Sequence, residues 1–389
     1  MKHIIYIILI AAMLFHFSCD CKKTSNYRLI PSEYSSFDMP EGSLYPKFHN
    51  SFYQNKSQWI VFRVLPPDSP YGSLALVYYR QDSSNLTRWH YSHTIQLPEF
   101  NNHKVFDMFT NNVDSVFVSP YNGFEVKVVY ADTARKSYTC YVDTAQQTNE
   151  SEYRNQILIV DDVRNWMFYN DALYTILYHN DLISETFAEL MEENFKLPLY
   201  GKFVNKNGVF ELEKTFGRWS EFYRTNFCGG LGDRDASMVT DSQYLYTTFR
   251  HDHNVYIYDD TMLIAKKPMQ SPNVKKLVGM DYESNPTEMA TYWITNDRYG
   301  RFYYDPYRQL FYRQAMYPSP EYLKENSKLR QLLQNWDLLI FDKEMNYVGK
   351  HYFIGDRHLS FIAVLPEGLL VQCYGNENVK MQLFKVEKK

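Results

Sequence analysis

The sequence predicts an all-β protein, a six-bladed β-propeller closed by an N-terminal strand, with two helical insertions on one face. Three observations lead to this prediction. Aromatic residues make up 17% of the 389 residues, including 35 Tyr and 26 Phe, and these residue types favour half-buried pleated surfaces. From about Phe48 onward, short β-forming runs alternate with turn residues. A turn-forming residue followed by Asp and Arg recurs at Arg234, Arg298 and Arg357, at intervals of about 60 residues.

The clearest unit of this pattern runs from Asp235 to Gln270. It consists of ASMVTD, YLYTTFR, VYIYDD and MLIAKKPMQ, which are short β-forming runs joined by tight turns. Strands joined in this way form a meander, which is the unit of a propeller blade. The interval between the Asp-Arg turns equals about one sixth of the chain that follows residue 18. Each Asp-Arg turn is therefore predicted in the loop that ends one blade and begins the inner strand of the next.

The last group of strands lacks one strand. FIAVL, LLVQCYG and VKMQLFKVE predict strands that leave one edge of their sheet without a partner. The segment NYRLIPSEY, Asn26–Tyr34, is predicted to supply the missing strand and to close the ring. The predicted blades are Phe48–Pro98, His103–Thr144, Asn155–Phe216, Asp235–Gln270, Arg301–Ile354, and Phe361–Val386 together with the N-terminal strand.

Two segments within the pattern are predicted to be helical. DLISETFAELMEEN, Asp181–Asn194, places three apolar residues near one face of a helix. SPEYLKENSKLRQLLQN, Ser319–Asn335, begins with Ser319 as the N-cap and Pro320 at the first helical position. Both segments interrupt a blade between its second and third strands, and in a propeller those loops share a face with the loops between blades. The helices and the Asp-Arg turns are therefore expected on the same face.

Residues 1–18 predict a lipoprotein-type signal peptide. Lys2 precedes an apolar run of about 14 residues, which is shorter than the ~20 residues that a membrane span needs. Cys19 follows a small residue at the end of this run, which resembles the lipobox of bacterial lipoproteins and implies lipidation of Cys19. Ordinary secretion with cleavage nearby is the alternative, because His16 stands where a lipobox usually has Leu.

The predicted mature chain consists of a tether, residues 19–25, and a single propeller domain, residues 26–389. It is expected to contact the membrane through its N-terminal lipid. The net charge of −4 and the absence of a long basic run argue against nucleic-acid binding. The other cysteines show no CxxC spacing, so no zinc site is predicted. They are Cys21, Cys140, Cys228 and Cys373.

Aromatic-rich runs that end in Asp, such as VYIYDD and LLIFDK, occur together with YYDPYRQLFYR (Tyr303–Arg313) and the lipobox-like start. In these features the chain resembles the uncharacterised six-bladed β-propeller lipoproteins of Bacteroidota, which contain domains of unknown function distantly similar to TolB-like and NHL-type propellers. The resemblance covers the mature chain. It implies a lipid anchor in the cell envelope, at the outer membrane, with the propeller in the periplasm or at the cell surface. It supplies no catalytic residue.

Two patterns nominate ligand contacts. The Asp-Arg turns could place guanidinium groups at the channel mouth, where their planar fork suits carboxylate, sulfate or phosphate. Alternatively, each Asp caps its own turn and each Arg crosses to a neighbouring blade. In FRHDHN (Phe249–Asn254), His251 and His253 have the spacing at which two side chains on a strand point the same way. They could share a metal ion, with Asp252 or a carboxylate of a neighbouring blade completing the site, or they could contact another ligand, whereas a solvated turn is the alternative. No metal site is predicted from one pair of histidines.

Two further segments carry candidate residues. FYRTNFCGGLGDRD (Phe222–Asp235) is glycine-rich but lacks the spacing of a phosphate-binding loop, so it is interpreted as a blade connector or a ligand contact. RFYYDPYR (Arg301–Arg308) offers Arg and Tyr side chains that could stack a sugar or hold a peptide, or pack between blades. The predicted ligand-binding residues are Arg224, Arg234, His251, Asp252, His253, Arg298, Arg301, Tyr304, Arg357 and His358.

The sequence contains no G-x-S-x-G, H-E-x-x-H or sialidase Asp-box motif, and no catalytic residue or cofactor is predicted. The interpretation is a binding or scaffold protein whose loop-rich face holds a glycan, a peptide or a partner protein. The alternative is a propeller lyase or hydrolase that uses Arg, His and Tyr at the channel mouth. The two differ in geometry, because an enzyme needs these side chains to converge on one pocket whereas in a scaffold they pair with one another.

Overall fold

The structure is a computed structural model. It describes residues 26–41, 44–65, 74–97, 105–110, 112–120, 125–130, 135–141, 157–159, 167–179, 189, 192, 195–207, 209–228, 236–281, 286–319, 334–355, 357–374 and 379–389. Within these residues, no helix has the length and hydropathy that crossing a membrane requires. The predictions for residues 1–25, and for Arg234 in the first Asp-Arg turn, lie outside the described residues.

Two sheets each contain four strands that follow one another in sequence and pair antiparallel, as the turn spacing predicts. The first sheet consists of β2 (Leu44–Gln54), β3 (Ser57–Leu65), β4 (Ala75–Gln81) and β5 (Trp89–Gln96). The second consists of β15 (Ala236–Thr240), β16 (Leu245–Phe249), β17 (Asn254–Asp259) and β18 (Met262–Pro268).

A nine-stranded sheet joins two further groups of sequential strands, because β14 pairs in parallel with β9. One group consists of β6 (Val105–Phe109), β7 (Ser115–Pro120), β8 (Glu125–Tyr130) and β9 (Arg135–Tyr141). The other consists of β10 (Ile157–Ile159), β11 (Met167–Tyr169), β12 (Ala172–His179), β13 (Tyr200–Lys206) and β14 (Val209–Phe216).

An eight-stranded sheet contains the last two groups and the first strand of the chain. Strand β1 pairs antiparallel with β25 from Tyr27 opposite Lys388 to Phe37 opposite Val379, and Tyr27 also pairs with Gly349 of β22. The segment predicted as a strand at Asn26–Tyr34 thus lies beside the last strand of the chain. The strands are β19 (Arg298–Asp305), β20 (Leu310–Met316), β21 (Trp336–Phe341), β22 (Tyr347–Phe353), β23 (His358–Leu365), β24 (Gly368–Cys373), β25 (Val379–Lys388) and β1 (Tyr27–Phe37).

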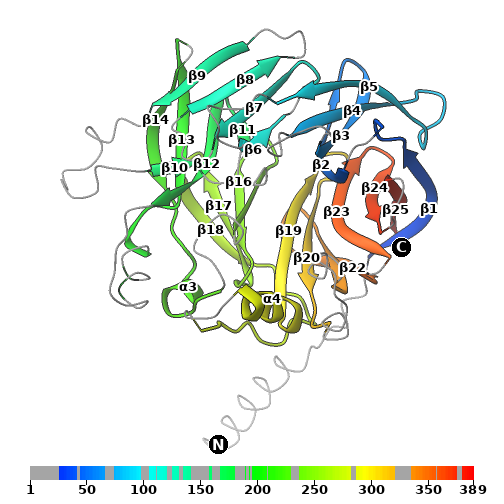
Figure 1. Cartoon of the computed structure of the whole chain (residues 1–389). Helices are drawn as coiled ribbons and strands as arrows, with labels where there is room; N and C mark the ends of the chain where they lie inside the picture. The colour runs from blue at the N-terminus through cyan, green and yellow to red at the C-terminus, as the bar shows by residue number, and fades with distance from the viewer. Residues whose placement is uncertain are drawn as a thin grey trace, which may run out of the picture.

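The groups of strands follow one another around the molecule, as the colours of Figure 1 show. The first strands of successive groups are neighbours: β2 contacts β23, β23 contacts β19, and β19 contacts β15. The prediction of an all-β fold is confirmed, and the fold is propeller-like.

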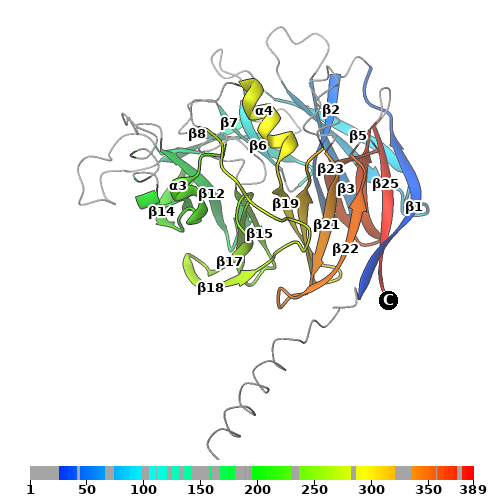
Figure 2. The same ribbon diagram turned by 90° about the horizontal axis from the view of Figure 1, so that it is seen from below.

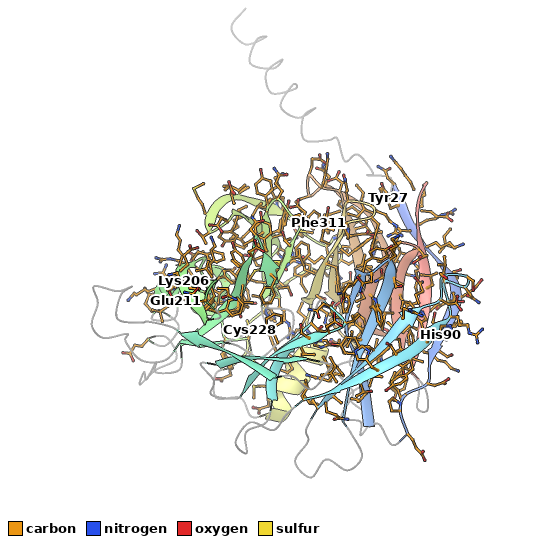
Figure 3. All side chains as sticks on the ribbon, turned by 90° about the horizontal axis from the view of Figure 1, so that it is seen from above. Tyr27, His90, Lys206, Glu211, Cys228 and Phe311 are labelled. Atoms are coloured by element: carbon orange, nitrogen blue, oxygen red, sulfur yellow. The ribbon has the colours of Figure 1, made fainter. Side chains whose placement is uncertain are left out.

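Two helices are described, α3 (Phe222–Thr225) and α4 (Pro286–Thr295). Sequence reasoning missed α4, although Pro286 at its first position and Glu288 in its first turn are helix-start signals. Most of the predicted helix Asp181–Asn194, and residues 320–333 of the predicted helix Ser319–Asn335, lie outside the described residues. Figure 2 shows α4 on one side of the molecule and the C-terminus, the start of β1 and β18 on the other, and Figure 3 shows Tyr27 at the edge opposite α4.

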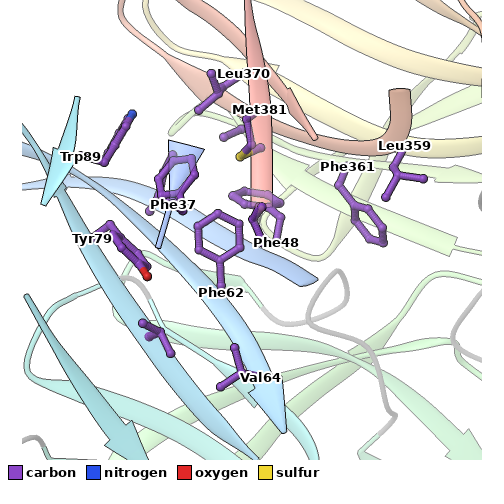
Figure 4. Close-up of a cluster of buried hydrophobic side chains, with 14 of the residues drawn as sticks. Phe37, Phe48, Phe62, Val64, Tyr79, Trp89, Leu359, Phe361, Leu370 and Met381 are labelled. Atoms are coloured by element: carbon purple, nitrogen blue, oxygen red, sulfur yellow. The ribbon is translucent and has the colours of Figure 1, made fainter. Parts of the chain in front are cut away.

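A buried cluster connects β1 with the first and last groups of strands (Figure 4). Phe37 of β1 is fully buried there, and its ring centroid lies 4.8 Å from that of Phe62 on β3 and 5.2 Å from that of Tyr79 on β4. Met381 of β25 and Phe361 of β23 belong to the same cluster. The N-terminal strand therefore contributes apolar packing between two sheets as well as hydrogen bonds to one of them.

Candidate functional site

The turn between β16 and β17 carries the predicted residues His251, Asp252 and His253, and it is enclosed by α3 and α4. The His251 side chain is only 1% exposed. Its Nδ1 lies 3.2 Å from the hydroxyl of Tyr223 on α3, and its Nε2 lies 3.0 Å from the hydroxyl of Tyr292 on α4. The interpretation as a solvated turn is wrong for His251 and Asp252, because both are buried.

The hydrogen bonds around His251 define the neutral form of its imidazole. Tyr292 donates its hydroxyl proton to the carbonyl of Val278 at 2.6 Å, so its oxygen accepts from Nε2–H of His251. Tyr223 accepts from the backbone N–H of His251 at 3.0 Å and is left to donate to Nδ1. Burial is the main cause that lowers the pKa of His251 to about 3, and the positive charges of Arg250 and Arg298 contribute to the same shift.

His251 is expected to destabilise the folded protein as the pH falls. The unfolded chain takes up the proton near the ordinary pKa of about 6.5, whereas the folded chain takes it up near 3. Between these values the unfolded state holds more protons, so the free energy of unfolding falls by about 1.4 kcal/mol for each unit of decreasing pH. Urea titrations at several pH values measure this slope. In the His251→Gln variant the slope should be smaller by the contribution of one proton, about 1.4 kcal/mol for each pH unit. Equal slopes for the two proteins would contradict the assignment.

Asp252 and His253 contact partners different from those of His251. Burial acts to raise the pKa of Asp252, but hydrogen bonds from Tyr256, Ser220 and Asn254 outweigh it and lower the pKa. The Tyr256 hydroxyl donates to Oδ2 of Asp252 at 2.6 Å. Nδ1 of His253 lies 2.7 Å from the hydroxyl of Tyr299 on β19. The two histidines therefore contact tyrosines of different elements.

Arg313 of β20 holds this turn from inside the molecule, and sequence reasoning missed it. Its guanidinium is fully buried and donates to the carbonyls of Phe249 at 2.7 Å, Asp252 at 2.6 Å and Met269 at 3.1 Å. It also lies over the ring of Tyr299, 3.6 Å from the centroid. The available signal was a charged residue, followed by Gln314, within the otherwise apolar strand LFYRQAM.

Two of the predicted arginines contact neighbouring elements on this side of the molecule. Arg224 of α3 forms an ion pair with Glu192 at 3.0 Å and lies over the ring of Phe195. Arg298 is buried at the start of β19 and donates to the carbonyl of Trp293 on α4. Arg298 also lies close enough to His251 to affect its pKa. Arg298 and Arg224 thus belong to the surroundings of the β16–β17 turn.

The remaining predicted residues lie around other strands. The guanidinium of Arg301 lies over the Phe361 ring, 4.6 Å from its centroid, and the Tyr304 ring packs against Phe311 with 4.9 Å between centroids. Nε2 of His358 is 2.9 Å from Oε1 of Gln382. Arg357 is exposed in the turn before β23.

The described residues contain no group of three His, Cys, Asp or Glu side chains placed to hold a metal ion. Cys228 is buried and Cys373 is partly buried, and neither forms a disulfide with another described residue. The two histidines and the carboxylate of the β16–β17 turn are hydrogen-bonded to tyrosine side chains. These contacts limit the ability of the three groups to act as acids, bases or ligands.

The comparisons with known proteins agree with this architecture. Residues 218–351 match a family described as a domain of unknown function, DUF4221. A crystal structure of a member of that family from Bacteroides vulgatus has a TM-score of 0.68 at 14% identity, covering 94% of this chain and 100% of that one. The resemblance to an uncharacterised β-propeller family is thereby confirmed. No curated protein matches the sequence.

Weaker structural likenesses include two enzymes. A structure of streptogramin B lyase has a TM-score of 0.39 at 9% identity, covering 92% of this chain and 98% of that one. The periplasmic gluconolactonase of Pseudomonas aeruginosa has a TM-score of 0.38 at 10% identity, covering 87% of this chain and 88% of that one. These scores are too low to carry an argument about the present chain.

Proposed function

We propose that the chain is a six-bladed β-propeller, closed by β1 and anchored by lipid in the cell envelope, that acts as a binding or scaffold protein. The loop-rich face that carries α3 and α4 is its binding face, and the bound partner is a glycan, a peptide or another protein. The proposal rests on one observation: the side chains best suited to chemistry are engaged with one another. His251, His253 and Asp252 each hydrogen-bond to a tyrosine, and Arg224 pairs with Glu192.

An exposed patch next to β23 is where we place the ligand contact. Backbone hydrogen bonds hold its members together: Arg357 N–H donates to the Ile354 carbonyl at 3.1 Å, and Tyr374 N–H donates to the Arg357 carbonyl at 3.0 Å. Ile354 is 38% exposed and Tyr374 is 39% exposed. An arginine and a tyrosine from neighbouring backbone segments suit an anionic sugar or an acidic peptide, because the guanidinium can form paired hydrogen bonds and the ring can stack.

The Arg357→Ser/Tyr374→Ser double variant is expected to bind at least about tenfold more weakly to whichever ligand the wild-type chain selects from arrays of acidic and neutral glycans and peptides. Arg28→Ser is the matched control, because Arg28 is an exposed arginine on β1 that pairs with Glu387. Affinity would be measured by calorimetry and the ligand recovered for mass spectrometry. Equal binding by the double variant would contradict the placement, and cleaved ligand would favour the lyase or hydrolase alternative.

The anchoring part of the proposal makes a separate prediction. The chain purified from bacterial membranes is expected to begin at Cys19 and to carry a diacylglyceryl group, because the segment before it has the length and apolar character of a signal peptide. Mass spectrometry of the N-terminal peptide measures this. The Cys19→Ala chain should lack the lipid, and a wild-type chain without lipid would show that the protein is secreted by an ordinary signal peptide.

A further inference from the structure

Strand β18 presents three consecutive apolar residues to solvent at the end of its sheet. Met262 is 61% exposed, Leu263 51% and Ile264 45%. Strand β18 is the last strand in the order β15-β16-β17-β18. A strand with one buried face would hide alternate residues, whereas here both faces are exposed over these three positions. Consecutive exposed apolar residues on an edge strand mark a contact surface or an aggregation hazard.

This strand lies on the same side of the molecule as the start of β1. Nζ of Lys267 on β18 donates to the carbonyl of Glu344 at 3.2 Å, in the hairpin between β21 and β22. The N–H of Asn26 donates to the carbonyl of Val348 at 2.7 Å, just after that hairpin. One hairpin therefore contacts both β18 and Asn26, the first residue after the predicted tether. Figure 2 shows β18 and the start of β1 along one edge.

The other side of the molecule carries α4 and the ends of β20, β21 and β22 that lie opposite the β21–β22 hairpin. The N–H of Ser319, after β20, donates to the carbonyl of Ile294 in α4 at 2.9 Å. The N–H of Gly355, after β22, donates to Oδ1 of Asn335, which precedes β21. The molecule thus has a tether side, with Asn26, the β21–β22 hairpin and β18, and a helix side, with α3, α4 and the β16–β17 turn.

We propose that the tether side docks on the lipid bilayer and that Met262, Leu263 and Ile264 insert among its headgroups. This inference rests on the proposed anchor at Cys19. Residues 19–25 span at most about 25 Å when fully extended, so a lipidated Cys19 keeps Asn26 close to the bilayer. The apolar residues of β18 then meet the membrane at the same time as the anchor does.

Lysine residues next to Met262, Leu263 and Ile264 also suit a lipid bilayer as the partner. Lys266 is exposed on β18 and Lys267 follows it, while the predicted tether contributes Lys22 and Lys23. Basic residues beside an apolar segment strengthen binding to anionic headgroups, and a second weak contact adds to a single lipid anchor. The docked orientation turns the helix side, with the exposed patch of Ile354, Arg357 and Tyr374, away from the bilayer.

Hydrogen exchange of the lipidated full-length chain in vesicles of phosphatidylethanolamine and phosphatidylglycerol tests this docking, with the chain in detergent as reference. We expect the amides of residues 262–266 to exchange about tenfold more slowly on vesicles, while those of α4 exchange equally in both. The mass of the N-terminal peptide in the same sample reports lipidation, so failure of the anchor and failure of the docking are read separately. Equal exchange at residues 262–266 in a lipidated sample would overturn the proposal.

Flotation of the unlipidated Cys19→Ala chain with the same vesicles isolates the contribution of β18. Leu263→Asp is expected to reduce the vesicle-bound fraction about tenfold or more, because the variant loses the burial of one leucine side chain in the bilayer. Tyr352→Asp is the matched control and should leave the bound fraction unchanged, because Tyr352 is 53% exposed near the helix-side end of β22. A loss of equal size in both variants, or protection of β18 that rises with protein concentration without vesicles, would assign the surface to something other than the bilayer.

Discussion

Replacing Arg313 with methionine should lower the free energy of unfolding by about 3 kcal/mol. The Arg313 side chain is fully buried, and its guanidinium donates hydrogen bonds to the backbone carbonyls of Phe249, Asp252 and Met269. Methionine keeps most of the volume but donates no hydrogen bond, so these carbonyls lose a partner inside the protein. Urea denaturation followed by tryptophan fluorescence measures the change.

The control for this substitution is Arg80→Met, because Arg80 is exposed on β4. Its effect should stay within about 0.5 kcal/mol, as is usual for surface positions. A second readout separates the role of Arg313 in the site from general stability. Loosening the β16–β17 turn should raise the pKa of His251 towards its ordinary value, which NMR titration of the imidazole detects. An Arg313→Met chain that matches the wild type in both measurements would refute the role assigned to this residue.

Replacing Phe37 with alanine should cost about 3–5 kcal/mol of stability, the range for removing a large aromatic side chain from a core. The residue is fully buried between β1 and the first sheet, with its ring centroid 4.8 Å from that of Phe62. Tyr34 lies in the same strand but is 60% exposed, so Tyr34→Ala is the matched control. Thermal unfolding compares the two variants.

The contrast between these variants reports on β1 itself. If β1 contributes packing as well as hydrogen bonds, Phe37→Ala should unfold several degrees below Tyr34→Ala. Limited proteolysis should then release an N-terminal fragment from the Phe37→Ala chain first, because β1 is the strand that has lost its core contact. Similar melting temperatures for both variants would mean that the packing of β1 in Figure 4 adds little.

Sequence reasoning could predict the parts of the fold that depend on neighbouring residues. The strands β15 to β18 follow from alternation and turn chemistry within Asp235–Gln270, because antiparallel neighbours with tight turns are local structures. The strand at the N-terminus followed from a different argument, since a sheet edge left unpaired requires a partner. Helix α4 was missed because its apolar residues do not form a pronounced stripe, and its start signals at Pro286 and Glu288 were overlooked.

The surroundings of the candidate site depend on residues far apart in the sequence. His251 reads as a turn residue, and its burial comes from Tyr223 and Tyr292, which are 28 and 41 residues away. Arg313 is followed by a second polar residue, Gln314, in an otherwise apolar strand. Its acceptors lie 44 to 64 residues away, in β16 and in the segments next to β17 and β18. Periodicity and turn chemistry carry no information about such pairings, so the sequence could nominate the turn but not its partners.

The antiparallel pairing of β1 with β25 sets an order for synthesis and folding. Arg28 and Glu387, which form an ion pair across these strands, are 359 residues apart. The first strand to leave the ribosome must therefore wait for the last, and its sheet cannot be completed on a partly made chain. Until β25 has been made, β1 has no partner for its hydrogen-bonding edge, and that edge can pair with a strand of another chain.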